Sequence, residues 1–183
     1  MEADILLYIQ NNLRNPVLDP VMAIITHLCN GAFIWIALIV LLLMIKKTRR
    51  TGIACTAALL INVTIVNLII KNLVGRIRPY DVISELELLI ERQWDSSFPS
   101  GHTASSFAVA FAFFLKTPKK YGIPALVLAA LIGFSRLYVG VHYPSDVLCG
   151  MIIGMLSAFI AVKVTDRVFA RMDRKKQEKP TEE

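Results

Sequence analysis

The stretch VMAIITHLCNGAFIWIALIVLLLMI, residues 21–45, decides the fold class, because its 25 consecutive residues include no Asp, Glu, Lys or Arg. A helix needs about 20 apolar residues to cross the hydrocarbon core of a bilayer, so this stretch is long enough to span one. The whole chain of 183 residues is 55% hydrophobic, above the usual apolar share of a soluble domain. Its mean hydropathy is +0.57. The sequence therefore predicts a membrane protein.

Four further apolar segments follow the first. They are Gly52–Ile70, Thr103–Leu115 (which can be extended back through Ser100), Gly122–Val139 and Val147–Val162. We expect an all-α, polytopic membrane helix bundle with about five transmembrane helices. Residues 1–170 should form a single domain, and residues 171–183 a charged cytoplasmic tail that is disordered after Arg171.

The N-terminal residues predict one more helix, which would lie on the membrane instead of crossing it. Ile5, Leu6, Ile9 and Leu13 fall on one helical face before Asn15-Pro16. The first residues are acidic where a cleavable secretion signal would be basic. We expect an amphipathic interfacial helix over residues 2–14, with no role beyond anchoring.

Basic residues are distributed unevenly between the loops. Fourteen of the 20 Lys and Arg residues fall in the first and third loops between spans and at the C-terminus. They are Lys46, Lys47, Arg49, Arg50, Lys116, Lys119, Lys120, Lys163, Arg167, Arg171, Arg174, Lys175, Lys176 and Lys179. The positive-inside rule makes this side cytoplasmic and the other side extracytoplasmic. The net charge of +6 is thus a signal of topology, and no basic module for nucleic acid is present.

The long connection on the outer side, residues 81–95, combines five carboxylates with apolar residues. The spacing of Val82, Ile83, Leu86, Leu89 and Ile90 predicts an amphipathic helix at the interface, with Trp94 as an anchor. The alternation Leu86-Leu88-Ile90 also fits an extended segment.

Three polar clusters lie at the outer ends of the apolar segments. The first is Lys71 with Arg78-Pro79, the second is Pro99-Ser100-Gly101-His102, and the third is Ser135-Arg136 with His142 and Asp146. Ionisable residues next to lipid are costly, so a set of them marks a functional site by default.

The residue types in these clusters suit the chemistry of phosphate. His142 and Asp146 are four apart and share a helical face, so the carboxylate can fix one imidazole nitrogen and leave the other as a nucleophile or base. His102 comes from another segment and is available to protonate a leaving oxygen. These three residues are the candidate catalytic set.

The cations and the second cluster can bind the phosphate itself. Lys71, Arg78 and Arg136 can neutralise phosphate oxygens. Ser100 and Gly101 precede an apolar segment, and a helix N-terminus presents free amides to an anion. The sequence predicts no metal and no other cofactor, because two histidines and one aspartate surrounded by three cations are a poor cation site.

Together the three clusters resemble the signature of the type 2 phosphatidic acid phosphatase superfamily, which also includes vanadium haloperoxidases. The chain looks most like its small bacterial membrane members, which act on undecaprenyl diphosphate or phosphatidylglycerol phosphate. The resemblance implies a metal-independent reaction through a phosphohistidine. By that match His142 is the nucleophile, Asp146 its orienting partner and His102 the general acid. Lys71, Arg78, Ser100, Gly101 and Arg136 would bind phosphate, supported by Pro79, Pro99 and Ser135.

The function predicted from these observations is hydrolysis of a lipid phosphate or diphosphate on the extracytoplasmic face of the cell membrane. Undecaprenyl diphosphate is the favoured substrate, and phosphatidylglycerol phosphate and phosphatidic acid remain alternatives. A membrane protein that binds lipid phosphates without turnover is the alternative of another class. A vanadate-dependent haloperoxidase is disfavoured by the five predicted spans. The sequence does not fix the oligomeric state.

Overall fold

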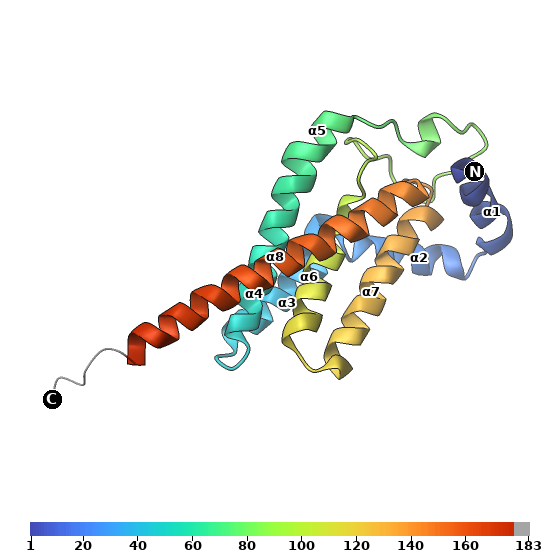
Figure 1. Ribbon diagram of the computed structural model, residues 1–183. Coiled ribbons are helices and arrows are strands. Elements are labelled where there is room, and N and C mark those ends of the chain that lie inside the picture. Colours follow the sequence, from blue (N-terminus) through green and yellow to red (C-terminus); the bar gives the residue numbers. More distant parts are fainter. Residues whose placement is uncertain (178–183) are drawn as a thin grey trace.

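The computed structural model describes residues 1–177 and shows an all-helical bundle with no strand among them (Figure 1). The helices that pack around the centre of the bundle are α3 (Phe33–Met44), α4 (Arg49–Val63), α6 (Gly101–Lys116), α7 (Lys119–Tyr138) and α8 (Pro144–Gln177). The remaining elements are α1 (Glu2–Leu13), α2 (Leu18–His27), η1 (Asn30–Ala32), η2 (Thr64–Ile70), α5 (Lys71–Val74) and η3 (Pro79–Asp81). The predicted fold class is confirmed.

Helix α6 forms the centre of the bundle, where it packs against α4, α7 and α8. Its residues Ala104, Ala108 and Ala112 are fully buried. The glycines of α8 allow a very close approach, because a Cβ atom at Gly154 would lie 2.4 Å from the carbonyl oxygen of Ala104. A Cβ at Gly150 would lie 2.7 Å from the carbonyl of Ser100. The small residues of α8 therefore hold it against α6 and the start of the second cluster.

Fewer than five of the helices in residues 1–177 are long and apolar enough to be recognised as membrane spans by length and composition. Three helices are long and apolar enough to cross a bilayer alone, and α2 with α3 makes a fourth only as a pair bent by 55°. Helix α6 has 16 residues, or about 24 Å at 1.5 Å per residue, which is short of a hydrocarbon core of about 30 Å. Because α6 is enclosed by its neighbours, it does not need the length of a lipid-facing span.

The first predicted span, residues 21–45, is broken and not continuous. Helix α2 ends at His27, and the chain passes through Gly31 and Ala32, both with φ near +57°, before α3 begins. An Asn-Gly pair favours such a turn. Thr26 and Asn30 lie at this break, and their side chains face Arg136 and His102. The polar residues inside the apolar stretch thus serve the site.

The second predicted span is one continuous helical rod made of α4, η2 and α5, in which η2 is a π-helical segment. Such wide turns inside α-helices are frequently found near functional sites. Lys71 follows η2 directly, and the rod ends at Gly75 with φ +58°. The chain then turns toward the bundle and brings Arg76 and Arg78 over the site.

The helix expected over residues 81–95 is absent. Only η3 is helical there, and the chain then runs irregularly to Ser100. Leu88, Leu89 and Ile90 pack onto a cluster around Tyr80 and Tyr138. The backbone of this segment is bound by side chains of α1, since Glu87 N–H donates to the Gln10 side chain and the Glu85 carbonyl accepts from it. Tertiary contacts therefore replace the internal hydrogen bonds of a helix. Trp94 is fully exposed.

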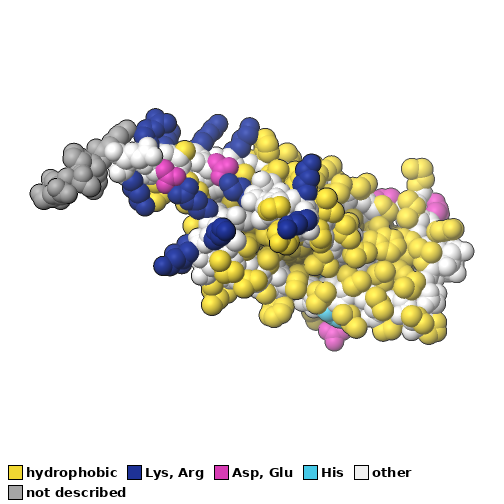
Figure 2. Space-filling model, turned by 90° about the horizontal axis from the view of Figure 1, so that it is seen from below, with side chains coloured by type: hydrophobic (Ala, Val, Ile, Leu, Met, Phe, Trp, Pro, Cys, Tyr) yellow, Lys and Arg dark blue, Asp and Glu magenta, His cyan; other side chains and the backbone are white. Residues whose placement is uncertain are grey.

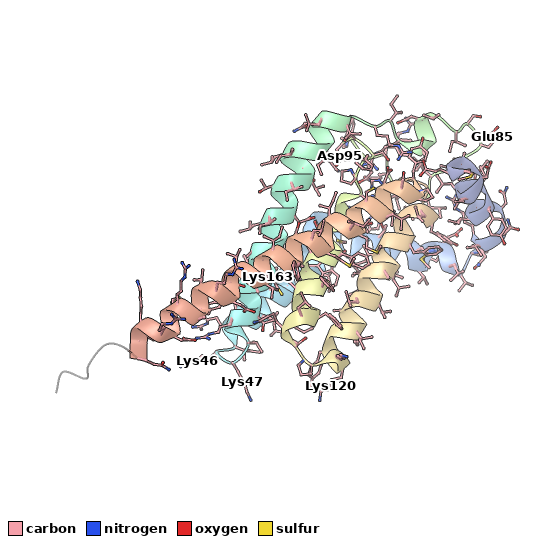
Figure 3. The ribbon with its side chains drawn as sticks, in the orientation of Figure 1. Lys46, Lys47, Glu85, Asp95, Lys120 and Lys163 are labelled. Atoms are coloured by element: carbon pink, nitrogen blue, oxygen red, sulfur yellow. The ribbon has the colours of Figure 1, made fainter. Side chains whose placement is uncertain are left out.

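The C-terminal tail also differs from the expectation of disorder after Arg171, because α8 continues through Gln177. The remainder of the predicted tail lies outside the described residues. Figure 2 shows Lys and Arg side chains gathered over the end of the molecule that carries the last turns of α8. In Figure 3, Lys46, Lys47 and Lys120 lie at the end opposite Asp95 and Glu85. The uneven distribution of Lys and Arg along the sequence thus places the basic side chains at one end of the molecule.

Candidate active site

The three polar clusters converge at the end of the bundle marked by Asp95 in Figure 3. Lys71 begins α5, and Arg78 lies in the segment that follows Gly75. Ser100 is the N-cap of α6. His142 lies in the turn between α7 and α8, and Asp146 in the first turn of α8. Direct contacts link Arg78 to His142, and Asp146 to both His142 and Ser100. Lys71 joins this set through Asp95, which also contacts Arg78.

His142 and Asp146 form the pair expected from their spacing. The Nδ1 atom of His142 lies 3.5 Å from Oδ2 of Asp146. The same oxygen accepts from the Ser97 hydroxyl and, at 2.9 Å, from the backbone N–H of Tyr143. An ionised carboxylate only accepts, so Nδ1 carries the imidazole proton and Nε2 keeps its lone pair. This is the state that a nucleophilic histidine requires.

The turn that carries His142 depends on local sequence. Gly140 has φ +81°, a conformation that favours glycine, and a Cβ there would lie 3.3 Å from the guanidinium of Arg14 and from the carbonyl of Glu87. Pro144 starts α8, where its missing N–H costs no helical hydrogen bond. His142 is consequently enclosed, with 1% of its surface exposed.

The environment of His142 favours the neutral imidazole. Burial lowers the pKa of His142 to about 3, although the hydrogen bond to Asp146 acts in the opposite direction. The cations Arg136 and Arg78 contribute to this lowering of the pKa. The Nε2 atom lies 3.5 Å from Nη1 of Arg78. The lone pair therefore faces a group that binds phosphate well.

Lys71 and Arg78 converge on one carboxylate, that of Asp95. Lys71 Nζ contacts Oδ2, and Arg78 Nη2 contacts Oδ1. The Nε of Arg78 donates to the backbone carbonyl of Asp95 at 2.8 Å. Desolvation opposes ionisation of this carboxyl, but Lys71 and then Arg78 outweigh it and lower the pKa of Asp95 to about 2. The two cations thus grip an anionic group in a geometry that also suits a phosphate.

Arg136 is buried at the bottom of the site, with 1% of its surface exposed. Its Nη1 donates to the Thr26 hydroxyl at 2.6 Å. Its Nε has no hydrogen-bond partner among the described residues. A buried guanidinium with unused donor capacity is costly unless an anion binds beside it. The arrangement fits the phosphate-binding role expected for Arg136.

The second cluster opens α6. The Ser100 hydroxyl accepts from Thr103 Oγ1 at 2.9 Å, and the Ser100 N–H donates to the backbone carbonyl of Asp146 at 3.0 Å. The position of a Cβ on Gly101 would be 3.7 Å from Lys71 Nζ. The Nε2 atom of His102 lies 3.0 Å from Oδ1 of Asn30. An amide oxygen accepts, so this nitrogen of His102 carries a proton.

A cavity of about 380 Å³ leads to this end of the bundle. Lys71, Asp95, Gly101 and His102 line its polar part. Its apolar part is formed by side chains of α3 and the α4 rod, among them Ile36, Leu59 and Val63. The cavity thus joins a charged pocket to an apolar passage.

The predicted supporting residues have simpler surroundings. Pro79 is buried at the start of η3, and Pro99 follows Phe98 through a cis peptide bond. The Ser135 hydroxyl donates to the backbone carbonyl of Ile132 in its own helix, at 2.7 Å. Ser135 therefore contributes to α7, and the structure does not bring its hydroxyl to the other predicted residues.

Sequence reasoning missed several residues of the site. The sequence gives Arg76 no role beyond that of a cation at the membrane interface, yet its guanidinium contacts Asp146. Asp95, Ser97 and Asn30 carried no signal beyond proximity to the motifs. No group of three or more His, Cys, Asp or Glu side chains suited to a metal ion occurs among residues 1–177. The prediction that no metal is needed stays a prediction.

Comparisons with known proteins point in one direction. The model of the PAP2 superfamily matches residues 51–170. An undecaprenyl-diphosphatase of Sulfolobus acidocaldarius is 33% identical over 72% of this chain, which spans 64% of that relative's length. The undecaprenyl-diphosphatase BcrC of Bacillus subtilis is 31% identical over 93% of this chain and 92% of its own.

A solved structure has the same arrangement of helices. It is that of a transmembrane PAP2-type phosphatidylglycerolphosphate phosphatase from Bacillus subtilis. The two superimpose with a TM-score of 0.75 at 28% sequence identity, over 91% of this chain and 85% of that one.

Proposed function

This chain belongs to the PAP2 superfamily, and on that premise we propose that it is a membrane phosphatase that converts undecaprenyl diphosphate to undecaprenyl phosphate and inorganic phosphate. The observation that carries the proposal is the enclosure of His142, held by Asp146, next to Arg78. Its neutral imidazole lies beside the guanidinium of Arg78, a group suited to binding phosphate. Arg78 and Lys71 both contact the carboxylate of Asp95 and so form one anion-binding pair. That geometry supports nucleophilic attack on phosphorus.

The reaction proceeds in two displacements. Nε2 of His142 attacks the terminal phosphorus, an N–P bond forms, and the bond from phosphorus to the bridging oxygen breaks. His102 donates a proton to that departing oxygen, and the lipid monophosphate is the product of this step. Water then gives a proton to His102 and attacks the phosphohistidine, the N–P bond breaks, and inorganic phosphate leaves with both imidazoles restored. Lys71, Arg78 and Arg136 stabilise the negative charge on the equatorial oxygens.

The cavity supports a lipid as the source of the phosphate. Its polar part lies at His102 and Lys71, and its apolar part at Ile36, Leu59 and Val63. The headgroup of a lipid would bind among the cations, while the first carbons of its chain would pass between α3 and the α4 rod. A soluble phosphate ester would leave the apolar passage unused.

The two relatives named as undecaprenyl-diphosphatases support this lipid as the substrate. The position of the site is consistent with it as well. The basic residues of the loops lie at the opposite end from Asp95 (Figure 3), so the positive-inside rule directs the site to the extracytoplasmic face. The protein would then act on the outer leaflet of the cell membrane, with its C-terminus in the cytoplasm.

Phosphatidylglycerol phosphate is the second candidate, because a structural relative is a phosphatidylglycerolphosphate phosphatase. Phosphatidic acid is also compatible with the cationic pocket. The charged residues bind the phosphate group and do not distinguish between the hydrocarbon chains of these lipids. The choice among the three lipids therefore depends on the apolar part of the cavity.

The test is phosphate release by the purified protein in detergent with EDTA, offered undecaprenyl diphosphate, phosphatidylglycerol phosphate and phosphatidic acid side by side. We expect the first to be hydrolysed fastest and EDTA to have no effect. The His142→Ala variant should lose at least about a thousandfold in kcat, because the nucleophile is gone. Arg92→Gln, which changes an exposed cation on the same side, should match the unmodified protein.

Each alternative has its own signature in this assay. Preference for either glycerol-based lipid would reject the proposed substrate and keep the reaction. Binding of the lipids without release of phosphate would favour the non-catalytic alternative. Full activity of His142→Ala would reject the mechanism.

A further inference from the structure

Arg76 occupies a junction that the proposed mechanism does not use. Its Nη1 donates to Oδ1 of Asp146 at 2.6 Å and to the Ser145 hydroxyl at 2.7 Å. Its Nη2 donates to Oε2 of Glu2 at 2.6 Å. The guanidinium carbon lies 3.9 Å from the centre of the Tyr143 ring. One side chain thus connects α1, the segment before η3 and the start of α8.

The two oxygens of Asp146 consequently have separate partners. Arg76 holds Oδ1, while Oδ2 faces Nδ1 of His142, the Ser97 hydroxyl and the N–H of Tyr143. A carboxylate bound on one oxygen by a charge-assisted hydrogen bond cannot rotate without breaking it. Arg76 therefore determines which oxygen is offered to His142.

Glu2 holds Arg76 from the other side. Its Oε2 accepts from Arg76, and its Oε1 accepts from the backbone N–H of Ser145 at 2.9 Å. The second contact caps the N-terminus of α8 with a carboxylate, which the helix dipole favours. These interactions lower the pKa of Glu2 against the effect of burial, so the carboxylate is ionised.

The far end of α1 is fixed as well. Arg14, which follows α1, donates from Nη2 to the backbone carbonyl of Tyr138 and from Nη1 to that of Glu87, each at 2.8 Å. Tyr138 is the last residue of α7, and α8 begins at Pro144. Helix α1 is therefore tied to both helices that flank the turn with His142.

We propose that Arg76 is a positioning residue for the reaction, and that Glu2 on α1 holds it so that Asp146 keeps His142 in the tautomer with a free Nε2. This inference rests on the proposed function and deepens it. It also gives α1 a role in the site, where the sequence predicted only an anchor. Arg76 and Glu2 act through Asp146 and do not touch the substrate.

The kinetic test compares two variants of the junction with two matched controls. Arg76→Met removes the cation while keeping much of its length, and Glu2→Gln keeps an acceptor without the charge. We expect kcat to fall at least about tenfold in Arg76→Met and about threefold in Glu2→Gln, since partners that orient a catalytic group commonly carry effects of this size. KM should stay within about twofold, because neither residue contacts the phosphate. Arg76→Lys should recover part of kcat.

The controls change the same residue types outside the junction. Arg92→Met removes an exposed cation that pairs with Asp81 and lies over the Tyr80 ring, outside the junction. Asp4→Asn removes an exposed carboxylate on the same turn of α1 as Glu2. Both should keep kcat and KM. A loss of kcat in the controls equal to that in the junction variants would overturn the proposal.

A second readout needs no turnover. The chain has three histidines, so imidazole ¹⁵N spectra of the ¹⁵N-histidine-labelled protein contain three ring pairs. His142→Gln identifies the signals of His142. We expect a single Nδ1–H tautomer in the unmodified protein at pH 7 and a mixture with Nε2–H in Arg76→Met, with Arg76→Lys closer to the unmodified protein.

The outcomes separate this inference from the proposed function. If the unmodified protein releases no phosphate from any lipid, the proposed function fails, while the tautomer of His142 still tests Arg76. If Arg76→Met does not fold, Arg76→Lys and Glu2→Gln carry the test. Unchanged kcat together with an unchanged tautomer in the variants that fold would overturn the proposal.

Discussion

Asp95 is the residue whose surroundings say most about how the site handles an anion. Its carboxylate lies between Lys71 and Arg78, and it lines the cavity, whereas His142 lies deeper. A phosphate that reaches His142 must displace the Asp95 carboxylate from Lys71 and Arg78. The carboxylate and the substrate therefore compete for the same donors.

The Asp95→Asn variant should bind phosphate more tightly, because an amide competes for Lys71 and Arg78 less well than a carboxylate. We expect the inhibition constant of inorganic phosphate and the KM for the lipid to fall by about fivefold to tenfold. Asp81→Asn, on the same segment but paired with exposed Arg92, is the matched control and should have no effect. A rise of the inhibition constant in Asp95→Asn would mean that Asp95 aligns the cations instead of competing for them.

The low pKa of His142 gives a prediction for the pH dependence. Its folded-state pKa of about 3 lies below the ordinary value near 6.5, so the neutral nucleophile is fully present above about pH 5 and is lost only as the pH falls toward 3. We expect kcat/KM, corrected for ionisation of the substrate, to show no acid limb between pH 5 and 9. An acid limb near pH 6.5 would contradict the enclosed, neutral His142.

Among the elements, α6 and α8 matter most because their contact sets the distance between two clusters. The carbonyl of Ser100 lies against Gly150, and that of Ala104 against Gly154. Separating the two helices would move the N-terminus of α6 away from Asp146, whose carbonyl accepts from the Ser100 N–H. Small residues on α8 thus serve both packing and the geometry of the site.

The Gly154→Ala variant should be less stable by about 1–3 kcal/mol, because the added methyl group meets backbone atoms that cannot move alone. A Cβ there would lie 2.4 Å from Ala104 O and 2.9 Å from Ala108 N. Gly133→Ala is the matched control, since the atoms nearest its Cβ would belong to side chains, that of Thr103 at 3.3 Å and that of Val147 at 3.5 Å. Thermal unfolding in one detergent compares the two variants. Equal melting temperatures would show that α8 can shift away from α6 without cost.

Basic side chains are distributed unevenly between the two ends of the whole molecule. Basic side chains crowd the end with Lys46, Lys47 and Lys120, and the candidate site occupies the end with Asp95 (Figure 3). A charge asymmetry of this kind orients a membrane protein during insertion. The direction of the molecule in the membrane therefore decides which leaflet supplies the substrate.

The proposed orientation can be tested by labelling of introduced cysteines in intact cells with a membrane-impermeant maleimide. Glu85→Cys should react from outside, and Lys47→Cys only after the cells are opened. Cys29 and Cys55 are buried and Cys149 is partly buried. Labelling of the unmodified protein therefore measures the background from the native thiols. Labelling of Lys47→Cys in intact cells would invert the topology and move the site to the cytoplasmic leaflet.

Much of this organisation follows from the sequence, because its signals are local. Long charge-free stretches predict helices in a membrane, and the spacing of four between His142 and Asp146 predicts a pair on one helical turn. The uneven Lys and Arg residues predict an orientation. Gly150 and Gly154 predict close helix packing, which the α6–α8 contact confirms.

Only the tertiary structure decided the features that depend on distant partners. Arg76 resembles an ordinary interfacial cation until Glu2, more than 70 residues away, and Asp146 are brought to its two sides. Asp95 gains its role from two cations, and the break in the first apolar stretch places Thr26 and Asn30 against Arg136 and His102. Hydropathy and spacing describe neighbours along the chain, whereas hydrogen bonds form between whatever groups folding brings together. The sequence alone thus determined the fold class and the principal candidate residues, and the tertiary structure alone decided which residues position them.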